Sequence, residues 1–438
     1  MLLVSAACFG ARRAAERGVP PAQPAPTVPA VSASAVAPTA ASEIADRYRV
    51  EAIATRRFTH DALWRAIAPF TASRGLRTEE IGRSIQGRAI RAVTFGAGAD
   101  TVLLWSQMHG DESTATMALA DIFRFLAEAE GDPLCERLRR ELTIVAVPML
   151  NPDGAERFER ENAAGIDVNR DARELATPEA RALKTLRDRV RPRFGFNLHD
   201  QGARTRAGPD GLPAAIALLA PPRDETRGYD DVRARARLVA ATMATMLAER
   251  IPGRVARYDD TFNPRAFGDL MQRWGTSTVL IESGALPNDP QKQQLRAVNV
   301  AAILTALDAI ATGSFAAADS TAYESLAFNT GGARDVLIVG GQLVLPGKSP
   351  LRADVAIDYD DPVARTGGRI RDVGDLREGV AIDTVQAAGL FLHPDAATLE
   401  GRGGSVWLRI GAPARIALRR GGGATSELVR RVTEDAPR

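Results

Sequence analysis

Cysteine, histidine and lysine are all scarce in this chain of 438 residues. Its two cysteines, Cys8 and Cys135, exclude the framework of several bridges that holds small secreted domains together. A net charge of +2, with basic residues scattered along the chain, argues against nucleic-acid binding. No apolar run approaches the ~20 residues that span a bilayer. What is present, 45% hydrophobic and 25% charged residues, is typical of a globular protein, and the length predicts two domains.

The first 42 residues are predicted to lie outside any folded core. Residues 1–8 form a short apolar run with small residues before Cys8, which resembles the end of a bacterial lipoprotein signal. The charged start of such a signal is missing and the apolar segment is short, so a plain apolar tip is the alternative. Residues 19–42 are rich in Pro and Ala and uncharged, as in an extended linker. We expect a cell-envelope protein (periplasmic, secreted, or tethered through a lipidated Cys8), with a cytoplasmic protein as the alternative.

Between residues 43 and 312, strand-like and helix-like apolar spacings alternate. Two strands around a glycine turn are expected within 79–88. Further strands are expected at 101–107, 142–148, 194–198 and 277–281, and helices at 43–55, 60–73, 113–128, 178–190, 229–250 and 291–310. This alternation predicts an α/β fold, a three-layer sandwich with a mixed central sheet. His60, at the start of its helix, is expected to be a capping or surface residue.

Residues 313–438 have a different pattern, in which short strand-like segments alternate with glycine turns. This pattern predicts a small all-β domain. Segments 335–341, 352–357 and 368–376 resemble the small β-sandwich of amidohydrolases. In that family the sandwich leads into a metal-binding His-x-His and a barrel, whereas here no barrel follows and His393 has no ligand partner nearby. The domain is therefore expected to be accessory, with no catalysis of its own.

Two histidines and a glutamate offer a metal site. His109 and Glu112 follow one predicted strand, and His199 ends another. Two imidazoles and a carboxylate can hold a catalytic zinc and leave one position open. A His-x-x-Glu pair alone also occurs in solvated turns, but both histidines fall at carboxyl ends of strands, where ligands of such sheets bind, and Glu112 lies on the first helical turn behind His109. Glu282 ends a further apolar strand, where a carboxylate needs solvent, a partner or a metal-bound water.

Several segments, in this order, resemble the zinc carboxypeptidases of the funnelin (carboxypeptidase A-like) type. They are His109–Glu112, Asn151–Gly154, Gly165–Arg170, Asn197–His199 and Ile281–Ser283. The resemblance extends over residues 81–310. It implies one Zn²⁺ per chain, held by His109, Glu112 and His199. It also implies that Glu282 is the general base, which takes a proton from water and passes it to the leaving amine.

The same resemblance implies roles for polar residues between the ligands. Asn169 and Arg170 resemble the clamp for a substrate's terminal carboxylate, because a guanidinium fork matches that anion. Arg160 resembles the arginine that stabilises the oxyanion of the tetrahedral intermediate. Arg157 is the competing candidate because loop lengths differ here, and a solvated surface run is the alternative for both arginines.

One family feature is not matched. The family has a mobile tyrosine some twenty residues before its glutamate; Tyr258 lies too far upstream, and Phe262 lacks the hydroxyl. We expect its contribution to be absent or supplied by Arg265. Asp269 falls where the side-chain pocket should be lined and would favour a basic terminal residue, with a structural role as the alternative.

Taken together, these residues predict a monozinc metallocarboxypeptidase that cleaves the last amide bond of nutrient or cell-wall peptides bearing a free carboxylate. Asp111 and Asp200, beside the ligands, are expected to orient them or to be solvated turn residues. A zinc-dependent deacylase of N-acyl amino acids is the alternative among enzymes. A non-catalytic peptide- or glycan-binding protein on the same scaffold is the alternative outside them, although retention of Glu282 argues against it.

Overall fold

The computed structural model describes residues 38–73, 75–362 and 364–432, with the side chains of 38–42 left out. Cys8, the lipoprotein-like start and nearly all of the expected linker lie outside the described residues. The expected domain limits at residues 42 and 312 stay predictions.

The predicted mixed sheet is confirmed as an eight-stranded sheet in the order β1-β2-β4-β3-β5-β9-β7-β8. Its strands are β1 (Leu76–Arg83), β2 (Ala89–Phe95), β3 (Asp100–Ser106), β4 (Leu142–Val147), β5 (Phe194–Asp200), β7 (Ile216–Leu219), β8 (Val255–Arg257) and β9 (Ser277–Ser283). Strands β4, β3, β5 and β9 run parallel, so their carboxyl ends share one edge. Strand β7 pairs with β9 in the antiparallel sense.

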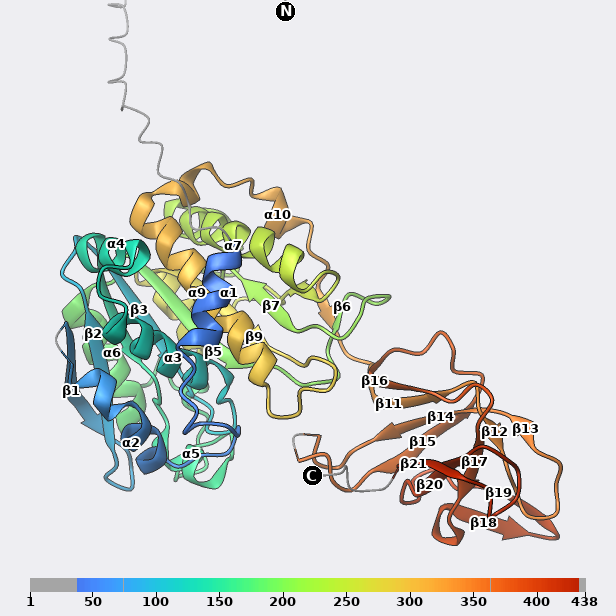
Figure 1. Ribbon diagram of the computed structural model, residues 1–438. Coiled ribbons are helices and arrows are strands. Elements are labelled where there is room, and N and C mark those ends of the chain that lie inside the picture. Colours follow the sequence, from blue (N-terminus) through green and yellow to red (C-terminus); the bar gives the residue numbers. More distant parts are fainter. Residues whose placement is uncertain (1–37, 74, 363, 433–438) are drawn as a thin grey trace, which may run out of the picture. The chain divides into compact units, whose positions relative to one another are not determined.

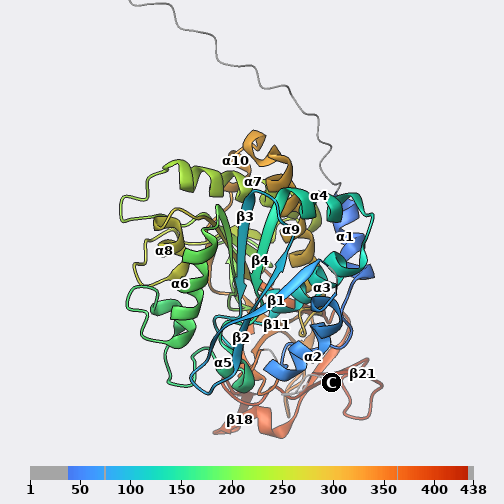
Figure 2. The same cartoon turned by 90° about the vertical axis from the view of Figure 1, so that its left-hand side faces the viewer.

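Helices cover both faces of this sheet and complete the three layers. One face carries α1 (Pro38–Arg47), α2 (His60–Thr71), α3 (Thr114–Glu128), α4 (Pro133–Glu141), α7 (Asp231–Arg250) and α9 (Gln293–Thr312), which share one apolar core. The other face carries α6 (Pro178–Val190) and α8 (Phe267–Arg273), which share a second core. Figures 1 and 2 show the sheet between these helices. Short elements are α5 (Pro152–Arg157), η1 (Val168–Arg170), η2 (Ser314–Ala317) and α10 (Thr321–Glu324). We call this part the α/β domain.

Helix α9 has the length and apolar composition of a membrane span, the one such helix among the described residues. Most of it is buried, and it contacts α1, α3, α4 and α7. Its few charges are paired: the Arg296 guanidinium donates to Asp121 on α3 and to the Val50 and Ile53 carbonyls. This apolar helix is therefore part of the domain core.

The predicted C-terminal β region is also present. A four-stranded sheet is ordered β15-β14-β11-β16 and a five-stranded sheet β13-β12-β17-β20-β21, and side chains from both sheets share one core. The strands are β11 (Arg334–Val339), β12 (Gln342–Leu343), β13 (Leu351–Arg352), β14 (Asp354–Asp358), β15 (Arg369–Gly374), β16 (Ala381–Gln386), β17 (Phe391–Pro394), β20 (Ile416–Arg419) and β21 (Leu428–Val432). Two-stranded pairs are formed by β6 (Arg206–Ala207) with β10 (Asn329–Thr330) and by β18 (Leu399–Arg402) with β19 (Ser405–Leu408), and η3 spans Ala396–Thr398. The resemblance to an amidohydrolase sandwich stays a prediction.

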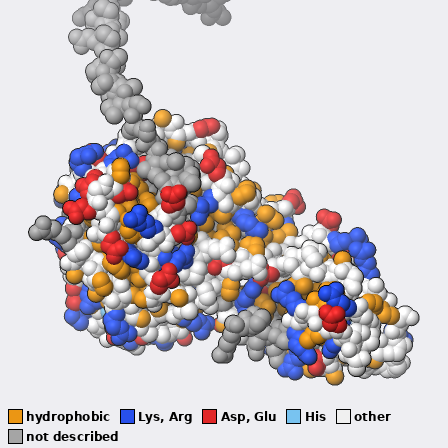
Figure 3. All heavy atoms as spheres, in the orientation of Figure 1, with side chains coloured by type: hydrophobic (Ala, Val, Ile, Leu, Met, Phe, Trp, Pro, Cys, Tyr) orange, Lys and Arg blue, Asp and Glu red, His pale blue; other side chains and the backbone are white. Residues whose placement is uncertain are grey.

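Surface charge is mixed on the face drawn in Figure 3, where basic and acidic side chains are interspersed. A nucleic-acid-binding surface would gather positive charge in one continuous area. This face has no such area.

Candidate metal centre and active-site cavity

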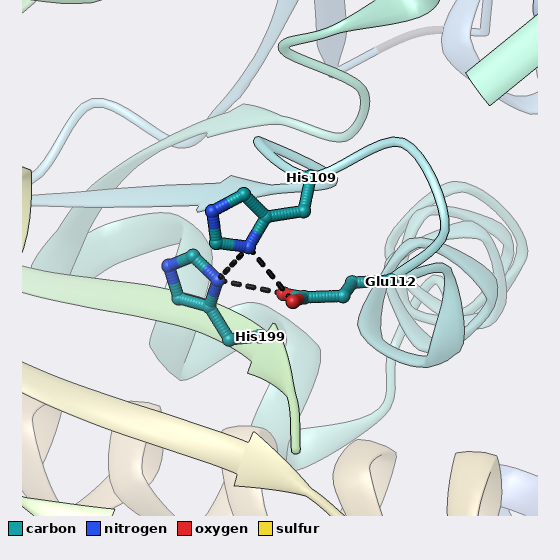
Figure 4. A group of neighbouring side chains, drawn as sticks. All are labelled: His109, Glu112 and His199. Atoms are coloured by element: carbon teal, nitrogen blue, oxygen red, sulfur yellow. Dashed lines mark hydrogen bonds and ion pairs between the residues drawn. The ribbon is translucent and has the colours of Figure 1, made fainter. Parts of the chain in front are cut away.

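The three predicted metal ligands meet at the carboxyl edge of the sheet. His109 lies just beyond β3, Glu112 just before α3, and His199 near the end of β5. The two histidine Nδ1 atoms are 3.2 Å apart, and each is 2.7 Å from a carboxylate oxygen of Glu112. Figure 4 shows both rings turned toward this carboxylate. Two imidazole nitrogens that point at each other beside an acid are arranged as ligands around a common cation.

This donor set fits zinc. All three side chains are buried, and their ligand atoms lie within 4.8 Å of one another. A cavity of about 610 Å³ adjoins the site and is lined by His109 and Glu112, so a fourth position can face substrate or water. The outer nitrogen of His109, Nε2, lies 3.0 Å from Asp167 Oδ1, a contact that fixes the tautomer and turns Nδ1 toward the metal. The sequence-based zinc assignment is confirmed.

Glycine keeps the backbone of this site compact. A Cβ on Gly110, next to His109, would lie 2.0 Å from the Gly154 carbonyl carbon, so no side chain fits there. Gly154 belongs to α5, whose first turn is capped by the Asn151 side chain accepting from the Gly154 amide at 2.9 Å. The Asn151–Gly154 segment thus supports the ligand loop from behind.

Asp200 orients the ligands, whereas Asp111 does not touch them. The Asp200 amide donates to Glu112 Oε2 at 3.1 Å. Its buried Oδ2 accepts from Arg56 Nη2 at 3.1 Å, Thr114 Oγ1 at 2.7 Å and Lys292 Nζ at 3.0 Å. Among the described residues, Asp111 Oδ1 is buried without a hydrogen-bond partner. Sequence reasoning missed Arg56 and Lys292, which are distant in the chain and meet only in the fold.

Glu282 faces the metal ligands from the neighbouring strand. It pairs with His199 in the parallel register of β5 and β9 and lines the same cavity. Only 8% of it is exposed, and no Lys or Arg of the described chain forms an ion pair with it. Burial, followed by the nearby charge of Glu112, raises its pKa well above the ordinary value. A carboxylate in this setting holds a proton more readily than one in water.

The two candidate arginines are separated by the structure. Arg160 lines the cavity, and its Nη1 lies 3.3 Å from Glu112 Oε1 while Nε and Nη2 hold Asp167 Oδ2 at 3.1 and 2.9 Å. Arg157 instead donates to Glu159 and to the Asn162 carbonyl, and it is not among the lining residues. Of these two candidates, Arg160 is therefore the one that lies at the metal site.

Asn169 and Arg170 stand together on η1, at the wall of the cavity. Asn169 Oδ1 accepts from the Phe267 amide at 2.9 Å, and Arg170 Nη1 donates to the Asn169 carbonyl at 2.9 Å. The Asp167 side chain caps this short helix by accepting from the Asn169 amide at 2.8 Å. Asp167 thus joins the Asn169 backbone, Arg160 and His109 in a single network.

A tyrosine does reach the cavity. Tyr258 follows β8, which lies beside β7 at the sheet edge, and its side chain lines the cavity. The charge of Glu282, followed by burial, raises its pKa to about 12, so the phenol keeps its proton. Phe262 also lines the cavity, whereas Arg265 does not and donates to the Arg170 carbonyl. Tyr258 lies too far upstream in the sequence to match the family's tyrosine by spacing. The fold nevertheless places its side chain at the cavity.

His60 and His393 stand apart from the metal centre. His60 is buried, not exposed as expected: Thr59 is the N-cap of α2, and His60 Nε2 lies 2.9 Å from the Ala89 carbonyl. His393 Nε2 lies 2.9 Å from the Gly421 carbonyl. Within the described part of the chain, the His109, Glu112 and His199 group is the one cluster suited to a metal.

Two histidines and one glutamate, at the carboxyl ends of strands in an α/β sandwich, form a ligand set that is typical of zinc hydrolases. Residues 70–204, which contain all three ligands, match the family model described as zinc carboxypeptidase. This segment of the α/β domain is therefore similar to the zinc carboxypeptidases.

Relatives of this chain share only part of its length. An uncharacterized protein of Zymomonas mobilis is 27% identical over 154 residues, 34% of this chain and 40% of that protein. Carboxypeptidase 2 of Trichophyton tonsurans is 31% identical over 120 residues, 26% of this chain and 22% of that protein. The chain thus spans less than half the length of these relatives.

Two of the solved structures that match part of this chain are those of carboxypeptidases. A metallo-carboxypeptidase from Burkholderia cenocepacia has a TM-score of 0.46 and 19% identity, covering 57% of this chain and 70% of that one. Carboxypeptidase A from Helicoverpa armigera has a TM-score of 0.47 and 17% identity, covering 62% of this chain and 80% of that one.

Proposed function

We propose that this protein is a metallocarboxypeptidase that removes the last residue of a peptide with a free terminal carboxylate. The observation that carries the proposal is a single cavity lined by metal ligands, a buried glutamate and an Asn-Arg pair. Nutrient peptides and cell-wall stem peptides both have such an end.

The groups in the cavity divide the chemistry among them. Zinc in such a site supplies Lewis acidity, which polarises a substrate carbonyl and makes water more acidic. Glu282, with its raised pKa, takes a proton from water and delivers it to the leaving amine. The Arg160 guanidinium stabilises the negative charge that develops on the carbonyl oxygen.

The position of the substrate is set by the side of the cavity that carries Asn169 and Arg170. Arg170 binds the terminal carboxylate through its guanidinium, and Asn169 presents an amide beside it. The protonated Tyr258 hydroxyl offers a hydrogen bond to the same end of the substrate. An amide bond held there lies between Glu282 and the metal ligands.

The test is substitution of Glu282 by Gln, read by mass spectrometry on a mixed peptide library. We expect zinc content to stay at about one per chain while single-residue C-terminal loss falls by at least about a hundredfold, because the proton carrier is removed. Glu225→Gln, at an exposed glutamate, is the matched control and should retain full activity. Full activity of the Glu282 variant would refute the mechanism.

The same library separates the alternatives. A deacylase would leave peptides intact and hydrolyse N-acyl amino acids such as N-acetyl-leucine. A binding protein would retain peptides without shortening them, even when loaded with zinc. Either result would replace the proposal.

We also propose a cell-envelope location, which rests on the uncharged Pro- and Ala-rich stretch after Cys8. Labelling of cells with a radioactive fatty acid tests the lipidated form. Incorporation that is lost in a Cys8→Ser variant supports a tether. A protein found only in the cytosolic fraction would contradict the location.

A further inference from the structure

A buried cluster of charged side chains adjoins the metal ligand Glu112. Its centre is Asp200, whose backbone amide donates to Glu112 Oε2 at 3.1 Å. Arg56 and Lys292 both donate to one carboxylate oxygen of Asp200, Oδ2, at 3.1 and 3.0 Å, and the three side chains are at most 7% exposed. We call Arg56, Asp200 and Lys292 the Asp200 cluster. Two cations meet one carboxylate in it, so the cluster has a surplus of one positive charge beside the ligand.

The position of Lys292 is unfavourable for a lysine. It is 4% exposed, and besides Asp200 its ammonium donates to the Ser283 carbonyl at 3.1 Å. Burial, followed by the charge of Arg56, lowers its pKa to about 8. Its backbone, at the N-cap of α9, is left-handed with φ of 51°, a conformation that favours glycine or asparagine. Neither burial nor backbone geometry therefore favours a lysine here, and the property that remains is its positive charge.

Other hydrogen bonds hold the segments of the cluster in place. Ser113, the residue after Glu112, donates its hydroxyl to the Arg56 carbonyl at 2.7 Å. The Arg56 amide donates to Gln291 Oε1, just before α9, at 3.0 Å. Asp289 accepts from two amides at the start of α9 at 2.7 and 2.9 Å. These bonds involve neither cationic side chain of the cluster, so they persist in a variant that removes one of the two charges.

Positive charge beside a carboxylate ligand changes how that ligand holds a metal. It draws the negative charge of Glu112 toward itself, so the carboxylate donates less to the metal. It also repels a divalent cation directly, and burial leaves this repulsion poorly screened. Both effects weaken zinc binding. A metal that receives less charge from its ligands is a stronger Lewis acid and polarises a carbonyl more strongly.

We propose that Arg56 and Lys292 are positioning residues that act on the metal through Asp200 and Glu112, and that their surplus positive charge weakens zinc binding and raises the Lewis acidity of the zinc. The effect on turnover rests on the proposed function, whereas the effect on zinc affinity is independent of any substrate. A purely structural role has the opposite sign for zinc binding, because a loosened Glu112 would bind zinc less tightly.

The test measures the zinc dissociation constant of the full chain by competition with a chelating dye. It is done at pH 7, below the pKa of about 8 of Lys292, so that its ammonium is charged. We expect Arg56→Met and Lys292→Met each to bind zinc at least about tenfold more tightly than wild type, because one buried positive charge is removed. Their kcat on one peptide should fall at least about fivefold, because the metal becomes a weaker Lewis acid. Arg56→Lys keeps the charge, and its zinc affinity should stay within about twofold of wild type.

Lys184→Met is the matched control for the loss of a lysine. Lys184 lies on α6 of the same domain, pairs with Asp188 and does not line the cavity. Its zinc affinity and kcat should stay within about twofold of wild type. Zinc binding that is unchanged or weaker in the two charge-removing variants would overturn the inference, and so would equal tightening in Arg56→Lys or in the control. If Lys292→Met does not fold, the comparison of Arg56→Met with Arg56→Lys decides.

The two readouts separate this inference from the proposed function. If zinc-loaded wild-type protein shortens no peptide, the proposed function fails, while tighter zinc binding in the Met variants still supports the effect of charge on affinity. If the wild-type protein is active and the Met variants bind zinc more tightly without a loss of kcat, the proposed function stands and the effect on Lewis acidity is overturned.

Discussion

His199 on β5 lies directly opposite Glu282 on β9, in the same parallel register that places Asn197 opposite Leu280. The positions of a metal ligand and of the glutamate that faces it are therefore fixed by one strand pairing. A slip of one residue would turn all of them to the opposite face of the sheet. The apolar cores on both faces of the sheet prevent it, because a slip would turn the polar side chains of His199 and Glu282 into the core on the opposite face.

Metal binding should stabilise the fold through His199. The ligands are buried and in mutual contact, so removal of zinc leaves their charges unbalanced, and a ligand bound only to the native state stabilises it by mass action. We expect EDTA to lower Tm by several degrees and added zinc to restore it. In His199→Ala the zinc response should vanish, while His393→Ala in the C-terminal β region should keep it. Thermal unfolding with metal analysis checks this, and an unchanged zinc response in the His199 variant would contradict the ligand assignment.

Arg160 and Arg157 allow a paired test of which arginine stabilises the negative charge that develops on the substrate's carbonyl oxygen. Arg160→Lys keeps a positive charge but loses the fork that holds Asp167 and faces Glu112. We expect kcat to fall by about a hundredfold, as when an oxyanion donor is lost. Arg157→Lys should stay within about twofold, because Arg157 does not line the cavity. Steady-state kinetics on one peptide compares them; equal losses would remove Arg160 from its proposed role.

The buried cluster around Asp200 should be important for stability. Arg56 and Lys292 both donate to one oxygen of Asp200, and all three side chains are at most 7% exposed. Asp200→Asn leaves two buried cations unpaired and should destabilise the protein by about 3–5 kcal/mol. Glu427→Gln, in the exposed pair with Arg420, should change stability by no more than about 0.5 kcal/mol. Urea unfolding measures both, and similar small effects would show that the cluster is not held together by charge.

Stability should depend on pH through Asp269. Burial raises its pKa to about 7 in the folded protein, above the value of 3.8 for an aspartate in water, so the folded state binds this proton more tightly. This contribution to stability is complete below about pH 4 and is lost as pH rises toward 7, a change of roughly 2–4 kcal/mol. Asp269→Asn removes the titration, so the variant should gain stability relative to wild type between pH 5 and pH 8. Urea unfolding of the metal-free proteins at both pH values tests this; a pH-independent difference would contradict the buried, unpaired carboxylate.

Secondary structure was predictable wherever apolar spacing is regular. Helix α6 begins and ends where expected, because Pro178 follows the Thr177 cap and Arg191 ends it in a left-handed conformation. The highly charged helix α4 was missed, although Asp132 caps it and Pro133 begins it. The four-residue strand β7 and the three-residue strand β8 were also missed, because such short segments carry too little pattern.

The sequence by itself determined the α/β class, the β region that follows and the three zinc ligands. These features depend on which residue types stand at the ends of strands, and they do not depend on how individual side chains pack. Only the tertiary structure decided that Arg160 and not Arg157 faces the metal site, that Tyr258 reaches the cavity, and that Asn197 lies within it. Each of these depends on how distant segments pack across neighbouring strands, and side-chain positions set by packing are not written in local spacing.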